Sequence, residues 1–157
     1  MRVKDGLNNK LYPKVFAGIA ACKLCKLSKI RHQVVVGDGS IKSSIVIIGE
    51  APGREEDEQG SPFIGRSGKL LRRLMKRAGF DAKPVYITNI VKCRPPNNRT
   101  PTNTEVKACS INLELQLRVI RPDTIVTVDN TALNYFRPKL HIMQPRSEIP
   151  SWSTLFW

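Results

Sequence analysis

The sequence predicts an α/β fold in three layers, with a central, mainly parallel sheet between two layers of helices. Short apolar runs at residues 45–48, 85–91 and 124–128 have the length and the flanking turn residues of buried strands. Segments with helical spacing of apolar residues separate these runs. Strands that alternate with helices favour parallel pairing with helices on both faces. The length of 157 residues fits one domain, residues 1–157, with a core of its own.

The composition is strongly basic. Twenty-six Lys and Arg residues against 13 Asp and Glu residues give a formal net charge of +13. This balance indicates a polyanionic partner, most simply nucleic acid, and the alternative is a soluble protein whose surface is merely basic. No run of 18 apolar residues is present, so we expect no membrane span. The first residues lack the apolar core of an export signal, so we expect a cytoplasmic protein.

The first third of the chain leads to a candidate binding loop. We expect a helix at residues 7–21, with Pro13 in its first turn, and then a short connection that ends in the turn at residues 37–39. After the strand at residues 45–48, the Gly- and Pro-rich residues 49–68 are expected to form a long loop. In an open α/β sheet, ligands bind in the loops at the carboxyl ends of strands, so this loop is the first candidate site.

A basic helix is expected directly after this loop, from Ser67 to Gly79. One face carries the apolar residues Leu70, Leu71, Leu74, Met75 and Ala78, and the other carries the cations Lys69, Arg72, Arg73, Lys76 and Arg77. Such a pattern is typical of a helix that packs its apolar face on the core. The cations form either a solvated face or a face that contacts phosphates.

The second half of the chain continues the alternation of strands and helices. Residues 93–104 are expected to be a loop because of their prolines, and Thr102 with Glu105 fits the capping box that begins a helix running to about Ile120. The strand at 124–128 is followed by a short helix at residues 131–136. The tail, residues 137–157, is atypical, since its apolar end has no polar cap. Its aromatic residues are Trp152, Phe156 and Trp157.

Four cysteines suggest a metal centre. Cys22 and Cys25 form a close pair, and Cys93 and Cys109 a wider one. In a cytosolic chain, metal binding is favoured over disulfides. Four thiolates suit zinc or an iron–sulfur cluster, and the spacing does not choose between the two; free structural thiols are the remaining alternative.

Two long motifs resemble those of the family 4 uracil-DNA glycosylases. The first reads GEAPGREED at residues 49–57 and GSPFIGRSGKLL at residues 60–71, and the second reads YITNIVKCRPP at residues 86–96. The similarity extends from about Cys22 to Tyr135. It implies a parallel four-stranded sheet between helices, and excision of uracil from single- or double-stranded DNA by a monomer. It also implies that Cys22, Cys25, Cys93 and Cys109 hold a [4Fe-4S] cluster.

The resemblance also implies roles for residues of the candidate loop. Gly49, Glu50 and Ala51 match positions that line the uracil pocket, and Glu50 and Ala51 face the sugar and the base. Phe63 matches the aromatic residue that stacks on the flipped uracil, and Asn89 matches the side chain that reads the uracil edge. Ala51 falls where another glycosylase family has a water-activating Asp.

These residue types suit the chemistry that the resemblance implies. A base must leave the duplex before an enzyme can cleave its glycosidic bond. The amide of Asn89 offers both a donor and an acceptor, which suits O4 and N3–H of uracil and disfavours cytosine. Taken alone, each residue has a simpler interpretation. Phe63 suits a core position, Asn89 a strand-end cap, and Glu50 a solvated loop.

The sequence departs from the family pattern near its end. Members carry a third motif, His-Pro-Ser or His-Pro-Ala, whose His donates to uracil O2, and this sequence has no His-Pro pair. Val128-Asp129-Asn130 also differs from the usual Leu-Gly turn. We therefore expect a truncated or diverged member that lacks the last strand and helix. The alternative function is that of a catalytically impaired iron–sulfur protein that binds DNA.

Overall fold

The computed structural model describes residues 5–80, 84–142 and 153–155. Five strands form one sheet in the order β1-β3-β2-β4-β5. Strand β1 pairs antiparallel with β3, and all other neighbouring strands are parallel. The strands are β1 (Asp38–Gly39), β2 (Ile45–Gly49), β3 (Val85–Asn89), β4 (Thr124–Thr127) and β5 (Ser153–Leu155).

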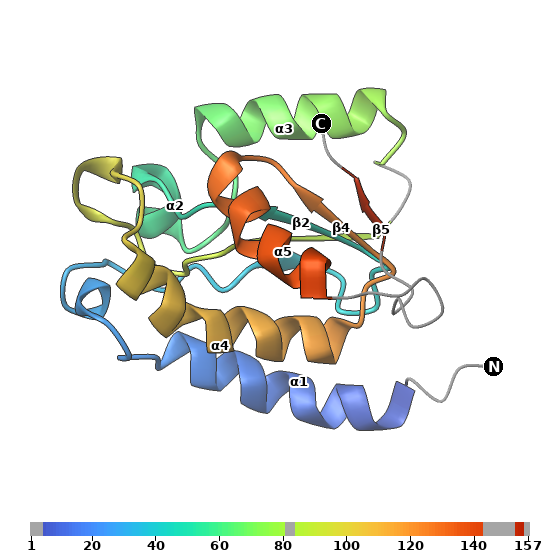
Figure 1. Ribbon diagram of the computed structural model, residues 1–157, viewed down its shortest axis with the longest axis horizontal. Coiled ribbons are helices and arrows are strands. Elements are labelled where there is room, and N and C mark those ends of the chain that lie inside the picture. Colours follow the sequence, from blue (N-terminus) through green and yellow to red (C-terminus); the bar gives the residue numbers. More distant parts are fainter. Residues whose placement is uncertain (1–4, 81–83, 143–152, 156–157) are drawn as a thin grey trace.

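Helices cover both faces of this sheet, which confirms the predicted three-layer fold. Figure 1 shows α3 on one side of the strands, and α1 and α4 on the other. The helices are α1 (Asp5–Ala20), α2 (Arg54–Gln59), α3 (Arg66–Arg77), α4 (Asn103–Ile120) and α5 (Asn130–Ile142), with short 3-10 helices η1 (Lys26–Lys29) and η2 (Pro96–Asn98). No helix among the described residues is both long and apolar enough to cross a membrane.

The main core lies between the sheet and the layer formed by α1, α4 and α5. It contains Val46, Ile48, Tyr86, Ile90, Ile125, Leu113, Leu117, Ala132 and Phe136. Phe16 of α1 packs edge-on against Tyr86, with ring centroids 6.1 Å apart. Alternate residues of strands β2 and β3 thus point into the core. The ends of these strands remain available for a site.

The predicted helix at 102–120 is confirmed in detail. The Thr102 hydroxyl accepts from the backbone N–H of Glu105, and the Glu105 carboxylate accepts from the N–H of Thr102 at 2.8 Å. This is the capping box that the sequence predicted, and it satisfies two donors that the first turn leaves open.

Two expectations about loops and helix ends were wrong. The loop at residues 49–68 contains helix α2, whose six residues carry no apolar stripe and are fixed instead by buried carboxylates described below. Pro13 lies in the middle of α1 and not in its first turn, so the helix accepts one missing N–H donor at that point.

The end of the chain differs from the expectation too. Helix α5 extends to Ile142, past the predicted end at 136. A short strand at Ser153–Leu155 pairs parallel with β4, so the sheet does have a fourth parallel strand, which the sequence suggested was missing. The open backbone donors and acceptors of β4 explain why this segment pairs there. The predicted aromatic end, Trp152, Phe156 and Trp157, lies outside the described residues.

The apolar face of α3 is less buried than predicted. Leu70 and Leu74 are 50% and 51% exposed, and Ala78 is exposed, whereas Leu71 and Met75 are half-buried. The helix therefore covers its side of the sheet with only part of the predicted face.

Candidate active site at the carboxyl edge of the sheet

The carboxyl ends of β2 and β3 border a cavity of about 250 Å³. Four of the five residues predicted for the uracil pocket line it: Glu50, Ala51, Phe63 and Asn89. The other lining residues are Pro52, Gly53, Glu56, Ser67, Pro95, Asn98 and Arg99. Gly49 and Asn89 occupy facing positions in the parallel register of β2 and β3, which explains how two distant motifs meet.

Gly49, the fifth predicted residue, lies where the pocket side chains converge. A Cβ atom at this position would stand 2.5 Å from Cζ of Phe63 and 2.9 Å from Oδ1 of Asn89. The absence of a side chain at Gly49 therefore makes room for both residues. Oδ2 of Asp129, at the end of β4, lies 3.3 Å from the same point.

Asn89 is almost fully buried, with 2% of its surface exposed, yet it lines the cavity. Its side-chain amide has no hydrogen bond with any residue in the described part of the chain, although its backbone carbonyl accepts from Nζ of Lys92 at 2.7 Å. An amide that borders a cavity can pair with a ligand or with water. The arrangement therefore presents a free donor and a free acceptor to whatever enters the cavity.

The candidate loop is fixed by two buried acidic residues of α2. One oxygen of Glu56 accepts from the N–H groups of Ile64 and Gly65, at 3.0 and 2.8 Å, and the other accepts from the N–H of Gly53 at 3.1 Å. Asp57 accepts from the N–H of His32 with both oxygens. These bonds tie the outgoing and returning arms of the loop together.

Phe63 is held in place by α3. Its backbone is left-handed, with φ of 53°, and the neighbouring helix residue Gly68 allows a very close approach: a Cβ there would stand 2.0 Å from the Phe63 carbonyl atoms. The Arg72 guanidinium donates to the carbonyls of Phe63 and Pro62 at 3.3 and 3.4 Å. A strained backbone persists only where its surroundings over-determine it, as here.

The carboxyl groups of Glu50 and Asp129 both contact the first turn of α5, on the β4 side of the pocket. The Thr131 hydroxyl donates to Oε2 of Glu50 at 2.5 Å, and the N–H of Ala132 donates to Oδ1 of Asp129 at 2.8 Å. Burial raises the pKa of Asp129, and the charge of Glu50 acts in the same direction, while backbone N–H groups oppose both. Glu50 is thus fixed in orientation next to a second acid.

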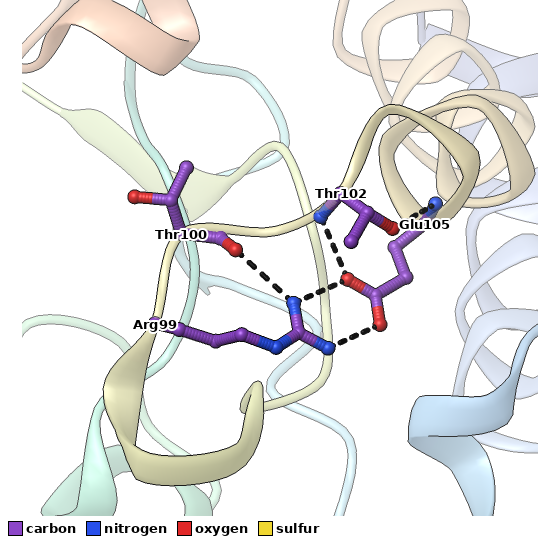
Figure 2. Close-up of polar contacts among 4 residues, drawn as sticks. All are labelled: Arg99, Thr100, Thr102 and Glu105. Atoms are coloured by element: carbon purple, nitrogen blue, oxygen red, sulfur yellow. Dashed lines mark hydrogen bonds and ion pairs between the residues drawn. The ribbon is translucent and has the colours of Figure 1, made fainter.

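Another part of the cavity lining comes from the segment at residues 95–99, through Pro95, Asn98 and Arg99. Asn97 and Asn98 both have φ of 54°, and the Asn98 side chain accepts from Nε of Arg94 at 2.7 Å. Arg99 forms a two-pronged ion pair with Glu105, with both distances 2.8 Å, and also donates to the Thr100 carbonyl (Figure 2). Hydrogen bonds from Arg99 lower the pKa of Glu105 to about 2.

Polar side chains link three of the four cysteines. Nδ2 of Asn112 lies 3.3 Å from Sγ of Cys22 and 3.7 Å from Sγ of Cys109. Arg31 donates to Sγ of Cys93 at 3.1 Å and to the carbonyl of Cys22 at 2.8 Å. Burial raises the pKa of Cys93 to about 11, although Arg31 opposes this shift. Cys25 follows Cys22 closely in the chain.

Among the described residues, no three Cys, His, Asp or Glu side chains lie close enough to hold a metal ion. As a donor set, four thiolates suit zinc as well as an iron–sulfur cluster. The N–H groups that point at the sulfurs suit the negative charge of either centre.

Lys92 connects the cysteines to the pocket. It is 1% exposed, and its ammonium donates to the Thr88 hydroxyl at 2.6 Å and to the Asn89 carbonyl. Its backbone N–H points at Sγ of Cys109 at 3.4 Å. Burial lowers the pKa of Lys92 to about 7, and the sulfurs of Cys109 and Cys93 act against this shift.

Sequence reasoning missed several residues of this site. Glu56 and Asp57 lay in the first motif but received no role, and Arg99 lay in the loop at residues 93–104 without a role. Asp129 was noted only as a departure from the family pattern. A signal existed for Glu56, since it lies three residues after Gly53, the spacing of a capping contact.

The sequence matches one class of protein in a comparison with known families. Residues 36–154 match the model of the uracil DNA glycosylase superfamily, and the chain belongs to this superfamily. Similarity to several type-4 enzymes agrees with the resemblance seen in the two motifs.

Three relatives are named type-4 uracil-DNA glycosylases. The protein from Thermotoga maritima is 46% identical over 136 residues, which cover 85% of this chain and 71% of the relative. Those from Sulfurisphaera tokodaii and Saccharolobus solfataricus are 44% and 46% identical over 81% and 79% of this chain. The match spans 58% of the length of each of these two relatives.

Proposed function

We propose that this protein is a uracil-DNA glycosylase, which hydrolyses the bond between uracil and deoxyribose and leaves an abasic site, the first step of base excision repair. The observation that carries the proposal is the buried Asn89 amide, which has no hydrogen-bond partner in the described chain and borders a cavity beside Phe63. Membership of the superfamily and the named activity of its relatives support it.

Base selection follows from the groups that line the cavity. The uracil edge offers an acceptor at O4 and a donor at N3–H, and the Asn89 amide can satisfy both. Cytosine offers a donor and an acceptor in the opposite order, which would leave the buried amide unpaired, and such a mismatch disfavours binding strongly. The ring of Phe63 supplies stacking, about 1–3 kcal/mol for one base.

Cleavage of the glycosidic bond separates charge between the sugar and uracil, and the pocket has a carboxylate suited to the sugar. The bonding electron pair leaves with N1 of uracil, and the sugar becomes cationic at C1′ until water adds its oxygen there. The proton released by water completes the free base. Glu50, fixed by Thr131, supplies a negative charge for the sugar or an acceptor that orients water. The methyl group of Ala51 cannot act as a base, so only its backbone can contribute.

The finer expectations about partners belong to the same proposal. The net charge of +13 suits a DNA substrate. We propose that the protein acts as a monomer in the cytoplasm and accepts uracil in single- or double-stranded DNA, since a flipped or unpaired base presents the same edge to Asn89.

We also propose that Cys22, Cys25, Cys93 and Cys109 hold a [4Fe-4S] cluster. The donors from Arg31 and Asn112 toward three of the sulfurs support it. Such a cluster would cross-link the end of α1, the residues after β3 and α4. Protein purified without oxygen is expected to contain about four irons per chain and to absorb in the visible range. One zinc per chain, without iron, would replace this proposal with the zinc alternative.

Excision is tested with a labelled oligonucleotide that contains one uracil, in single- and double-stranded form. Incubation with the protein followed by alkali should cleave the strand at the uracil, because an abasic site is labile to base. The same strand with thymine or cytosine should stay intact. Salt-dependent DNA binding without cleavage, even with enzyme in excess over DNA, would contradict the proposal and favour the catalytically impaired relative.

A further inference from the structure

Helix α3 carries an unusual concentration of positive charge. Its 12 residues include six Lys or Arg and no acidic residue, so it supplies six of the net +13 charges. All six positions are exposed: Arg66, Lys69, Arg72, Arg73, Lys76 and Arg77. Like charges three and four residues apart destabilise a helix, so this pattern costs stability unless an anion offsets it.

Four of these cations form one stripe. Arg66, Lys69, Arg73 and Lys76 recur at intervals of three and four residues, which places them on one side of the helix. At 1.5 Å per residue, the stripe is roughly 15 Å long. Within the described chain, none of the four forms an ion pair, whereas Arg72, on the flank of the stripe, pairs with Asp38 at 3.7 Å.

Helix α3, which carries the stripe, begins at the rim of the base pocket. Ser67, in the first turn of α3, lines the cavity, and Gly68 and Arg72 hold the backbone of Phe63. A nucleotide whose base is stacked on Phe63 must pass its own phosphates over the pocket rim. Helix α3 therefore starts where the backbone of the DNA strand would leave the pocket.

We propose that α3 binds the phosphate backbone of the DNA strand next to the flipped nucleotide, through the stripe formed by Arg66, Lys69, Arg73 and Lys76. This inference rests on the proposed function for the identity of the strand. An anionic membrane surface is less suited to α3, because Leu71 and Met75 are half-buried against the protein and only Leu70 and Leu74 remain for insertion.

The test compares two triple variants with the same loss of charge. The first is Arg66→Ala, Arg73→Ala and Lys76→Ala in the stripe. The matched control is Lys14→Ala, Arg118→Ala and Arg137→Ala, at exposed positions of α1, α4 and α5. In Figure 1, α1 and α4 lie across the sheet from α3. Urea unfolding of both variants verifies that they remain folded.

The readout is the dissociation constant for duplex DNA that contains an uncleavable abasic-site analogue, between 50 and 200 mM salt. Binding therefore does not depend on excision. Each lost phosphate contact lowers the slope of log K against log salt by about 0.9. The stripe variant should lose about two to three units of slope and bind at least 10-fold more weakly at 100 mM salt, while the control stays within about 3-fold of the wild type.

Three outcomes would overturn the inference: equal weakening by both variants, no weakening by the stripe variant, or loss of binding to phosphatidylserine vesicles with DNA binding intact. A variant that keeps the charge, with Arg66→Lys, Arg73→Lys and Lys76→Arg, should bind as the wild type does. Stripe-dependent DNA binding in a protein that never excises uracil would uphold this inference while the proposed function fails.

Discussion

At the scale of the residue, the pocket depends on side chains whose surroundings restrict them to one arrangement. Asn89 has its backbone fixed by Lys92 and its amide left free, and Phe63 has its backbone fixed by Gly68 and Arg72. Preorganised groups of this kind bind a ligand without reordering themselves. The two motifs of the sequence predicted Asn89 and Phe63. Lys92 and Gly68 lie in the same motifs, but nothing in the sequence alone indicated that they fix the backbone of the pocket residues.

The Arg99–Glu105 pair at the pocket rim makes the free energy of unfolding depend on pH in the acid range. The pKa of Glu105 falls from 4.5 to about 2 in the folded protein, so its contribution is complete above about pH 4.5 and is lost as the pH falls toward 2. Glu105→Gln should lower the free energy of unfolding by about 1 kcal/mol at pH 7, because Arg99 is partly exposed and solvent weakens the pair.

Urea unfolding at pH 7 and pH 3 measures this effect. The difference between Glu105→Gln and the wild type should shrink at the lower pH. At pH 3 the unfolded Glu105 is mostly protonated, so ionising this side chain in the folded protein offsets part of the stabilisation by Arg99. Thr102 still caps the helix in both proteins, so the cap itself does not change. A difference of the same size at both values would show that the charge of Glu105 contributes nothing.

At the scale of the element, periodicity predicted the parts that bury apolar side chains and missed the parts built on polar contacts. Strands β2, β3 and β4 and helices α3 and α4 were predicted because their apolar residues recur at regular spacing. Helix α2 has no such pattern, since Glu56 and Asp57 fix it through backbone N–H groups of other segments. Strand β5 pairs through its backbone, which leaves no mark on composition.

The contact between α3 and the Phe63 loop can be tested with one methyl group. Gly68→Ala would bring a Cβ to 2.0 Å from the Phe63 carbonyl, so the loop must shift. We expect a loss of about 1–3 kcal/mol in the free energy of unfolding, as for overpacked sites, and a fall in kcat/KM for uracil excision.

Gly18→Ala in α1 is the matched control, because a Cβ at that position meets no atom within 4 Å. This helix substitution should stabilise the protein by about 0.5–1 kcal/mol and leave excision unchanged. Urea unfolding and steady-state kinetics of both variants give the comparison. Similar values for the two variants would mean that the close approach at Gly68 does not position Phe63.

At the scale of the whole molecule, the cysteine centre and the pocket are parts of one structure. Cys93 follows β3 by four residues, and Lys92 lies between it and the pocket residue Asn89. Cys109 lies in α4, which begins at the pocket rim. The sequence predicted the four ligands together, whereas the link through Lys92 depends on the folded positions of β3 and α4 and could not be predicted from spacing.

Loss of the proposed metal centre should therefore destabilise the protein as a whole. For Cys109→Ser we expect the Tm to fall by roughly 5–10 °C, which corresponds to about 2–3 kcal/mol for a domain of this size. Ser110→Ala, the next residue of α4, is the control and should leave the Tm unchanged. Calorimetry with parallel iron analysis measures both. An unchanged Tm in Cys109→Ser, with the metal lost, would show that the centre does not support the fold.

The most direct test of the central claim, that the pocket built by Asn89 and Phe63 selects uracil, is the base selectivity of Asn89→Asp. An ionised Asp offers only acceptors, so it repels O4 of uracil and accepts from the amino group of cytosine. Single-turnover excision from matched strands with one uracil or one cytosine gives the ratio. We predict that the variant loses its preference for uracil and gains excision of cytosine. Undiminished selectivity for uracil would contradict the account.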